Sequence, residues 1–398
     1  MSKKKKLIPE LRFPEFKNEG EWEVDIVDNL VSTITPPRKL TSSDYQKDGK
    51  FPIIDQSKSF YCGWTNDVDA VIKDDLPLII FGDHTCILKI TNKPFVQGAD
   101  GIKILKTKNK VIPEFLYQYL QYNEVKQEDY KRHFSILKEK SVLFPKKESG
   151  EQQKIASCLS SLDDLISAHS QKLDLLKDHK KGLMQNLFPQ EGEKVPKLRF
   201  KEFEKDGEWN FKKLNKLGNL LNGLTYSPDD VREEGLLVLR SSNVQNGLID
   251  LNDSVYVRTD IQGANLLKPN DILICVRNGS KNLIGKNAII PKGMPLSTHG
   301  AFMTVFRATN PEFVFQLFQT DFYDTQVKAD LGATINSING KNFLKYEFPV
   351  PENPKEQQKI ASCLSSLDAL ITAQAEKIEQ LKQHKKGLMQ GLFPKIND

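Results

Sequence analysis

Two long stretches of the sequence carry apolar residues at intervals of seven, the pattern of a helix that is covered along one side by a second helix. The first runs from Glu151 to about Leu187 without a proline, and its single glycine, Gly182, lies near the end. Polar His169 and Gln374 interrupt the columns, and we interpret them as register-setting or half-exposed residues. We expect packing between the helices by Ile155, Leu159, Leu162, Ile166, Leu173, Leu176, Leu183, Ile360, Leu364, Leu367, Ile371, Ile378, Leu381 and Leu388.

The two stretches are copies of one sequence. Residues 151–189 and 356–394 are identical at 29 of 39 positions without a gap. A second pair of matching segments precedes each globular region, PELRFPEF at residues 9–16 and PKLRFKEF at residues 196–203, and each leads to a Glu-Trp pair. With a period of about 200 residues, the repeat indicates a duplicated module rather than a solenoid.

The regions 22–150 and 209–355 differ in sequence, yet they share an order of features that predicts a common mixed α/β fold. In each, two apolar strand-like runs precede a strand opened by glycine and a helix that begins at a Pro-Glu-Phe triplet. The fold class is therefore α+β, with two domains that share a fold and differ in surface. In chain order the features are Phe51–Ile54, Leu76–Gly82, Gly101–Leu105 and Pro113 in the first region, and Leu236–Leu239, Ile272–Gly279, Gly300–Arg307 and Pro311 in the second.

The direction in which the helices pair follows from their place in the chain. Because each helix follows its own domain, an antiparallel pair sets one domain at each end of a rod, whereas a parallel pair sets both at one end. About 36 helical residues make a rod of roughly 54 Å, longer than one turn of B-DNA at about 34–36 Å. We expect an antiparallel, pseudo-twofold coiled coil, and the alternative is a coiled coil that only dimerises the chain.

Four consecutive parts make up the expected domain organisation. Residues 1–150 hold an N-terminal segment and the first domain, and residues 151–189 form the first spacer helix. Residues 190–355 hold a connector and the second domain, and residues 356–398 form the second spacer helix and a tail.

The composition is that of a globular protein, with 38% hydrophobic and 27% charged residues among 398. The balance of 57 Lys and Arg against 52 Asp and Glu gives a net charge of +5, which permits a nucleic-acid partner without requiring one. The five cysteines lie outside zinc-ligand spacing, and Cys158 and Cys363, at matching repeat positions, are expected to be small core residues. Since no run of about 18 apolar residues occurs, we expect a reduced, cytoplasmic protein.

The repeated line EQQKIASCLSSLD, which continues to HKKGLMQ and LFP, follows a short proline-containing strand end each time. It resembles the conserved helices of the specificity subunits of type I restriction–modification systems. The regions between the helices resemble that family's target-recognition domains, so the resemblance covers essentially the whole chain. The runs that carry it are Ile80–Thr85, Gly98–Gly101, Leu239–Val244, Arg277–Ser280 and Gly300–Met303.

The resemblance implies that each target-recognition domain reads one half of a bipartite site in double-stranded DNA and that the helices set the unread gap. It implies that the helices dock two adenine-N6 methyltransferase subunits and that restriction/translocase subunits complete the complex, with no role for a membrane. S-adenosylmethionine, ATP and magnesium would be bound by those partners and not by this chain. Because the two domains differ, the site should be asymmetric.

The sequence contains no catalytic or metal-binding motif, so we expect no activity of its own. The glycine-rich cofactor loop and the Asn/Asp-Pro-Pro-Tyr/Phe segment of a methyltransferase are absent. Residues 279–287 differ from a phosphate-binding loop, since five residues rather than four separate the glycines and Asn287 replaces the required Ser or Thr. Asp83 and His84 have no accompanying nucleophile, and we interpret them as a structural or DNA-contacting turn.

Arginine pairs well with guanine, and asparagine or glutamine with adenine, so polar loops hold the candidate DNA contacts. Each candidate taken singly is also consistent with an ordinary solvated surface group. We predict a non-catalytic DNA-specificity subunit; the alternatives are a coiled-coil DNA-binding regulator that acts without a methyltransferase, and a protein–protein scaffold. The candidates are Arg38, Lys39, Gln56, Lys58, His84, Thr85, Gln97, Lys131, Arg132 and His133 in the first region, and Arg240, Ser241, Ser242, Asn243, Gln245, Arg277, Asn278, Lys281, Ser337, Asn339 and Lys341 in the second.

Overall fold

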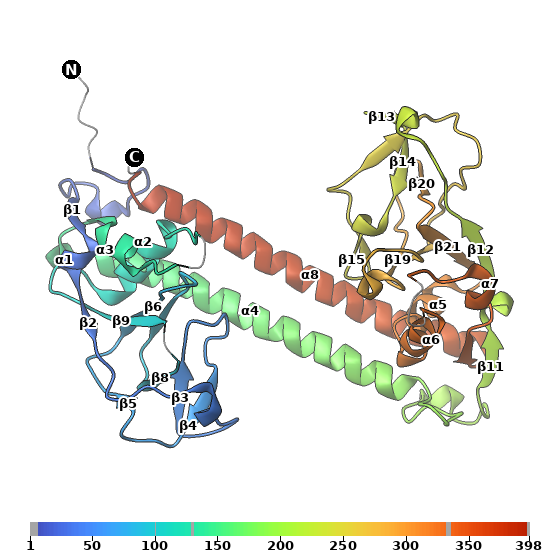
Figure 1. Cartoon of the computed structure of the whole chain (residues 1–398), viewed down its shortest axis with the longest axis horizontal. Coiled ribbons are helices and arrows are strands. Elements are labelled where there is room, and N and C mark those ends of the chain that lie inside the picture. Colours follow the sequence, from blue (N-terminus) through green and yellow to red (C-terminus); the bar gives the residue numbers. More distant parts are fainter. Residues whose placement is uncertain (1–6, 100, 129–130, 332–335, 396–398) are drawn as a thin grey trace. The chain divides into compact units, whose positions relative to one another are not determined.

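The computed structural model describes residues 7–99, 101–128, 131–331 and 336–395 (Figure 1). Asp100, which belongs to the run Gly98–Gly101, lies outside them. The described chain divides into two compact units. Unit 1 comprises residues up to 171 and from 375 onward, and unit 2 comprises residues 172–374. Each unit therefore combines one globular domain with segments of both repeat helices.

Unit 1 is built on two four-stranded sheets: the first packs on short helices on one side and shares a second core with the other sheet. The first sheet is antiparallel, and the second contains one parallel pair, β3 with β8. A two-stranded ribbon of β1 and β10 brings the two ends of the domain together. The first sheet has the order β2 (Val31–Ile34), β9 (Ile102–Thr107), β6 (Leu78–Gly82), β7 (Leu88–Thr91); the second has β4 (Gly63–Thr65), β3 (Phe51–Ile54), β8 (Phe95–Gln97), β5 (Val71–Ile72); the ribbon is β1 (Glu23–Ile26) and β10 (Ser141–Phe144); the helices are α1 (Val27–Leu30), α2 (Pro113–Tyr122) and α3 (Phe134–Glu139).

Unit 2 repeats this plan. It too has an antiparallel four-stranded sheet, a second sheet with one parallel pair, β14 with β20, and a ribbon that joins the ends of the domain. The first sheet has the order β12 (Gly218–Asn222), β21 (Met303–Ala308), β18 (Ile272–Cys275), β19 (Asn287–Ile289); the second has β13 (Val231–Arg232), β17 (Val255–Val257), β14 (Leu236–Leu239), β20 (Ser297–His299); the two ribbons are β11 (Asn210–Lys213) with β22 (Glu347–Val350) and β15 (Val244–Gln245) with β16 (Leu248–Ile249); the helices are α5 (Pro311–Leu317), α6 (Asp321–Leu331) and α7 (Gly340–Phe343).

The matching order of the first sheets and the parallel pair in each second sheet confirm that the two domains share one mixed α/β fold. The second sheets differ at one edge, because β5 pairs with β8 in unit 1 and β13 pairs with β17 in unit 2. The strands at Phe51–Ile54 and Leu236–Leu239 and both Pro-Glu-Phe helix starts are confirmed. Four strand bounds differ from the prediction. In unit 1, β6 begins at Leu78 rather than Leu76, and β9 spans Ile102–Thr107 rather than Gly101–Leu105. The strand that begins at Ile272 ends at Cys275, because the chain turns into a polar loop there, and the strand expected from Gly300 begins at Met303, because residues 300–302 form a turn.

The two repeat stretches are long unbroken helices, α4 (Glu151–Leu187) and α8 (Pro354–Leu392). Each begins with a glutamate that is almost completely buried, because an arginine from the PELRF or PKLRF segment binds it. Arg12 donates through Nε and NH2 to the two Glu151 oxygens at 2.7 and 2.6 Å, and Arg199 donates to Glu356 at 2.8 Å twice. The two pairs of repeated segments thus contact each other within each unit.

The carboxyl ends of the two helices enter the globular cores. In unit 1, Phe393 lies 5.8 Å from Phe115 and 6.5 Å from Trp22, between ring centroids. In unit 2, Phe188 lies 6.0 Å from both Trp209 and Phe313. The repeated LFP sequence is therefore part of each core. Unit 1 receives it from the end of α8, and unit 2 receives it from the end of α4.

Segments of the two helices pair antiparallel in each unit through equivalent ion pairs. In unit 1, Lys385 Nζ of α8 lies 2.6 Å from Asp163 of α4, and in unit 2, Lys180 Nζ of α4 lies 2.6 Å from Asp368 of α8. Both lysines interrupt the apolar columns of the sequence, and these ion pairs explain why a charge is tolerated there. A buried glutamine of each domain, Gln118 in unit 1, also donates to the same carboxylate.

The predicted packing columns need one correction. Ile155, Leu159, Ile360 and Leu364 belong to the globular cores of their units rather than to a seam between helices alone, because each helix docks its first turns on its own domain. Leu183 and Leu388 pack against the core edges. Farther along the helices, Leu367, Ile378, Leu381 and Gln374 are buried, whereas Leu162, Ile166, His169, Leu173, Leu176, Ile371, Cys158 and Cys363 are half-buried.

Candidate nucleic-acid interface

Four polar loops of unit 2 come together at the ends of its strands. The loop after β18 contacts the loop after β14, because Asn278 donates through Nδ2 to Ser241 Oγ at 3.1 Å. Arg277 forms an isolated backbone bridge with Ser337 and donates its N–H to Phe302 O at 3.1 Å. The sequence candidates Ser241, Arg277, Asn278 and Ser337, which are far apart in the chain, therefore share one surface.

Two of the unit 2 candidates, Asn243 and Arg240, bind groups of the neighbouring loops and so stabilise this surface. Asn243 is completely buried; its side chain accepts from the Arg240 N–H and donates to the carbonyls of Asp250 and Asp253. A direct base contact by Asn243 was therefore a wrong prediction, because its amide is consumed in holding the loop. The Arg240 guanidinium group is partly engaged in an ion pair, since its NH2 lies 2.7 Å from Asp253 Oδ1. Its buried Nε has no hydrogen-bond partner among the described residues.

The remaining unit 2 candidates lie at or near the surface. Gln245 in β15 donates to Ser242 O at 3.0 Å, and both residues are exposed. Asn339 caps α7 by accepting from the Lys341 N–H at 2.9 Å, so its side chain is structural, whereas the Lys341 side chain is exposed. Lys281 is exposed in the loop that follows Asn278.

In unit 1 a smaller group of candidates meets around Gln56. Its Oε1 accepts from the His84 N–H at 3.3 Å, and its carbonyl accepts from Thr85 Oγ1 at 3.0 Å. The His84 ring lies 3.2 Å from Lys131 O, and exposed Lys58 lies in the same loop as Gln56. Two loops and the segment before α3 therefore present Gln56, Lys58, His84, Thr85 and Lys131 together.

A residue that the sequence did not single out fixes this arrangement. The Lys89 side chain is 4% exposed, and its Nζ donates to the carbonyls of Asp55 and Ser59 at 2.8 and 2.6 Å. Burial lowers the pKa of Lys89. The loop 55–60, which carries Gln56 and Lys58, is thus tied to β7 by a buried ammonium group. A lysine between apolar residues of a strand was the only signal in the sequence.

Other unit 1 candidates are placed elsewhere. Gln97 and His133 are buried at 2% and 0% exposure, which makes them wrong predictions as DNA contacts. Asp83 Oδ1 accepts from the backbone N–H groups of His133 and Phe134 at the start of α3, so the Asp83-His84 pair is a structural turn. The candidates Arg38, Lys39 and Arg132 are exposed, and Arg38 lies 3.1 Å from Asp67.

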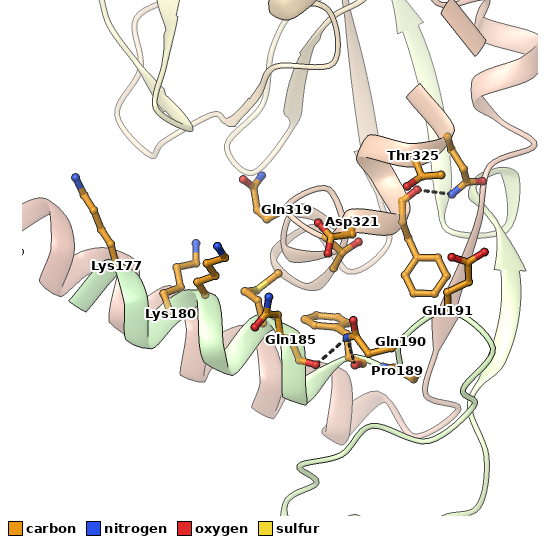
Figure 2. Close-up of a pocket in the computed structure, with 15 residues that line it drawn as sticks. Lys177, Lys180, Gln185, Pro189, Gln190, Glu191, Gln319, Asp321 and Thr325 are labelled. Atoms are coloured by element: carbon orange, nitrogen blue, oxygen red, sulfur yellow. Dashed lines mark hydrogen bonds between the residues drawn. The ribbon is translucent and has the colours of Figure 1, made fainter. Parts of the chain in front are cut away.

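A separate pocket of about 520 Å³ lies in unit 2 between the end of α4 and the start of α6 (Figure 2). Three lysines of α4 line one side, and Gln319, Asp321 and Thr325 line the other. None of the predicted DNA-contacting residues lines it. Its mixture of ammonium groups with Phe188 and Phe322 suits binding rather than acid–base chemistry.

Two general features bear on what the chain can do. Among the residues that the structure describes, no group of three or more His, Cys, Asp or Glu side chains is placed to hold a metal ion. Within the same residues, no helix is both long and apolar enough to cross a membrane.

The chain contains two copies of one fold, which differ in their polar loops, and each copy is joined to a copy of one helix. This arrangement is that of a modular protein with two recognition domains. Residues 19–178 and 206–383 match the family described as type I restriction modification DNA specificity domain. Since these matches cover most of the chain, it belongs to that family, whose members are non-catalytic specificity subunits.

Individual relatives agree with this assignment. The chain is 24% identical to the MjaVIII specificity subunit of Methanocaldococcus jannaschii, and the alignment covers 95% of this chain and 92% of that subunit. It is 27% identical to the StySPI specificity subunit of Salmonella potsdam over 46% of this chain, although that alignment spans only 42% of the relative. The crystal structure of the type I S subunit from M. genitalium has a TM-score of 0.69 at 16% identity, with 98% and 100% of the two chains covered, and shows the same fold.

Proposed function

We propose that this chain reads an asymmetric, bipartite site in double-stranded DNA, one half with the loops around Gln56 and the other with the loops around Arg277. The observation that carries this proposal is that one fold occurs twice while its polar loops differ. Shared strands hold the loops in equivalent places, and different side chains at those places select different bases. In such an interface, cationic side chains bind the DNA phosphates and neighbouring polar side chains contact the bases.

The proposal assigns the repeat helices two tasks. They set the length of the unread gap, because 37 residues of α4 correspond to roughly 56 Å of helix. They also dock two adenine-N6 methyltransferase subunits, to which restriction/translocase subunits are added; S-adenosylmethionine, ATP and magnesium belong to those partners. Support comes from apolar side chains on the outer helix faces: Leu165 is 42% exposed and its repeat equivalent Leu370 is 57% exposed.

The test is a map of N6-methyladenine. The chain is co-expressed with the adenine methyltransferase encoded beside it, in a host that lacks adenine methylation. We expect methylation at one asymmetric motif, two short blocks separated by a fixed gap, which disappears without this chain. Methylation that is unchanged when the chain is removed would contradict the proposal and favour a DNA-binding regulator or a scaffold.

A second experiment tests the modular division. Residues 22–150 are replaced by the equivalent region of another member of the family, and the methylation motif is mapped again. We expect only one block of the motif to change, because the loops around Gln56 and those around Arg277 act on different blocks. A change in both blocks would contradict the assignment of one block to each domain.

A further inference from the structure

One arginine of unit 2 differs from the others in what its guanidinium group contacts. Unit 2 contains six arginines. Among the described residues, five of them bind a carboxylate or a backbone carbonyl of their own unit, which satisfies donors of their guanidinium groups; these are Arg199, Arg232, Arg240, Arg258 and Arg307. Arg277 is exposed, and no described carboxylate or carbonyl accepts from its guanidinium group.

The Arg277 guanidinium group lies over an aromatic ring instead. Its Cζ atom is 5.8 Å from the centroid of the Phe302 ring, within the range of a cation–π interaction. Phe302 is 57% exposed at the tip of the turn that precedes β21, a position where a large apolar side chain is unusual. The ring contact limits where the guanidinium group can lie and does not use its N–H donors.

The backbone beneath this pair is fixed on both sides. Phe302 O accepts from the N–H groups of Val276 and Arg277 at 3.0 and 3.1 Å. On the other side, Val276 O accepts from the Ile338 N–H at 2.8 Å. Two other segments of the chain therefore hold the base of the Arg277 side chain, so its position depends little on loop motion.

A hollow of about 290 Å³ opens beside the pair. Its lining includes Arg277 and the polar side chains of Asn222, Thr304 and Ser337. A concave surface with a few convergent polar groups is the form that recognition sites take. Arg277 therefore lines a recess rather than a flat surface.

We propose that Arg277 reads a guanine in the half-site of the second domain and that Phe302 is the positioning residue that orients its guanidinium group. The planar fork of arginine matches the O6 and N7 acceptors of guanine in the major groove. Phosphate also accepts bidentate contacts from arginine, and the duplexes that vary one base pair at a time distinguish the two contacts. This inference rests on the proposed function, because it assumes that the domain binds DNA.

The experiment uses the full chain in complex with its methyltransferase. Wild type, R277A, R277K, F302A and F302Y are compared in competition binding on duplexes that vary one position of the motif at a time, and their methylation motifs are mapped. R258K is the matched control, because Arg258 is an exposed arginine of the same domain that already binds Asp230. A duplex with 7-deazaguanine, which lacks the N7 acceptor, probes the contact directly.

We expect R277A and R277K to lose preference for guanine at one position of one block, by roughly five- to a hundredfold, the range of one bidentate contact. F302A should relax the same position, and F302Y should restore it because it keeps the ring. Wild type should bind the 7-deazaguanine duplex more weakly, and R277A should not distinguish it from guanine. The other block and the R258K motif should stay unchanged.

Different results separate the possible failures. If R277A binds every duplex more weakly but keeps the wild-type base preference, Arg277 contacts phosphate and the inference is wrong. If all Arg277 and Phe302 variants retain the complete motif of an active wild type, the inference fails while the proposed function stands. If wild type itself has no motif, the proposed function fails first, and thermal unfolding of each variant distinguishes loss of reading from loss of fold.

Discussion

The buried ion pair between Arg12 and Glu151 permits a quantitative test of how the repeated segments hold unit 1 together. The two side chains are 6% and 1% exposed, and the pair is bidentate. R12A leaves the Glu151 carboxylate buried without its cation. Breaking such a pair by removing one partner costs about 3–5 kcal/mol, because the remaining charge keeps its desolvation penalty. The loss should therefore be a large part of the unit's stability.

The assay combines thermal unfolding with hydrogen exchange on the full chain. For a folding unit of 150–250 residues, 1 kcal/mol corresponds to about 2–4 °C in Tm, so R12A should lower the transition by roughly 6–20 °C. Exchange should rise in residues 113–122 and 389–393 of the unit 1 core, which pack near the start of α4.

Two controls make the reasoning refutable. K395A removes a surface pair with Glu10 whose side chains are 54% and 72% exposed, and it should cost at most about 1 kcal/mol. The double variant R12M/E151M removes both charges and should recover most of the stability lost in R12A. An R12A protein within 1 kcal/mol of wild type, or a double variant as unstable as R12A, would refute the account.

Three further predictions follow from single features. L165D and L370D each place a charge on an exposed helix face, so the free energy of unfolding should change by less than about 0.5 kcal/mol. Each variant should lose one methyltransferase subunit when the complex is analysed by size-exclusion chromatography, and retention of both subunits would contradict the docking proposal. K89M removes the ammonium group that ties loop 55–60 to β7, so exchange in that loop should rise and affinity for the first half-site should fall, with the second half-site unaffected. Burial lowers the pKa of His299 below its ordinary 6.5, so the unfolded state binds a proton at a pH where the folded state does not. Unit 2 should therefore keep its full stability above pH 6.5 and lose up to about 1.4 kcal/mol per pH unit below it. H299Q should flatten this dependence in thermal melts between pH 5 and 8.

Much of the fold was predictable because duplication repeats local signals. The spacing of apolar residues predicted both long helices, and the Pro-Glu-Phe triplets marked helix starts that the structure confirms. The same spacing did not distinguish a helix that packs on another helix from one that packs on a domain core. Ile155 and Ile360 satisfy both descriptions, and only the tertiary structure assigns them to the cores.

The recognition loops were harder to predict, because sequence gives the chemistry of a side chain and not its partners. Asn243 and Arg277 are both polar residues after a strand. The Asn243 side chain is buried in hydrogen bonds to the backbone, whereas Arg277 is exposed and lies over the Phe302 ring. His133 looked like a surface residue among charged neighbours, but the turn at Asp83 buries it. The structural role of Lys89 was not predicted, because a lysine in a strand is usually at the surface.

The LFP segment at the end of α8 has a consequence for the order in which the chain acquires structure during synthesis. Unit 2 is made of consecutive residues, 172–374, so all its parts have emerged before translation ends. Unit 1 needs Leu392 and Phe393 in its core, although most of its residues precede unit 2 in the chain. The domain synthesised first therefore completes its core last. A chain that ends before Leu392 would therefore carry a complete second domain and an incomplete first one.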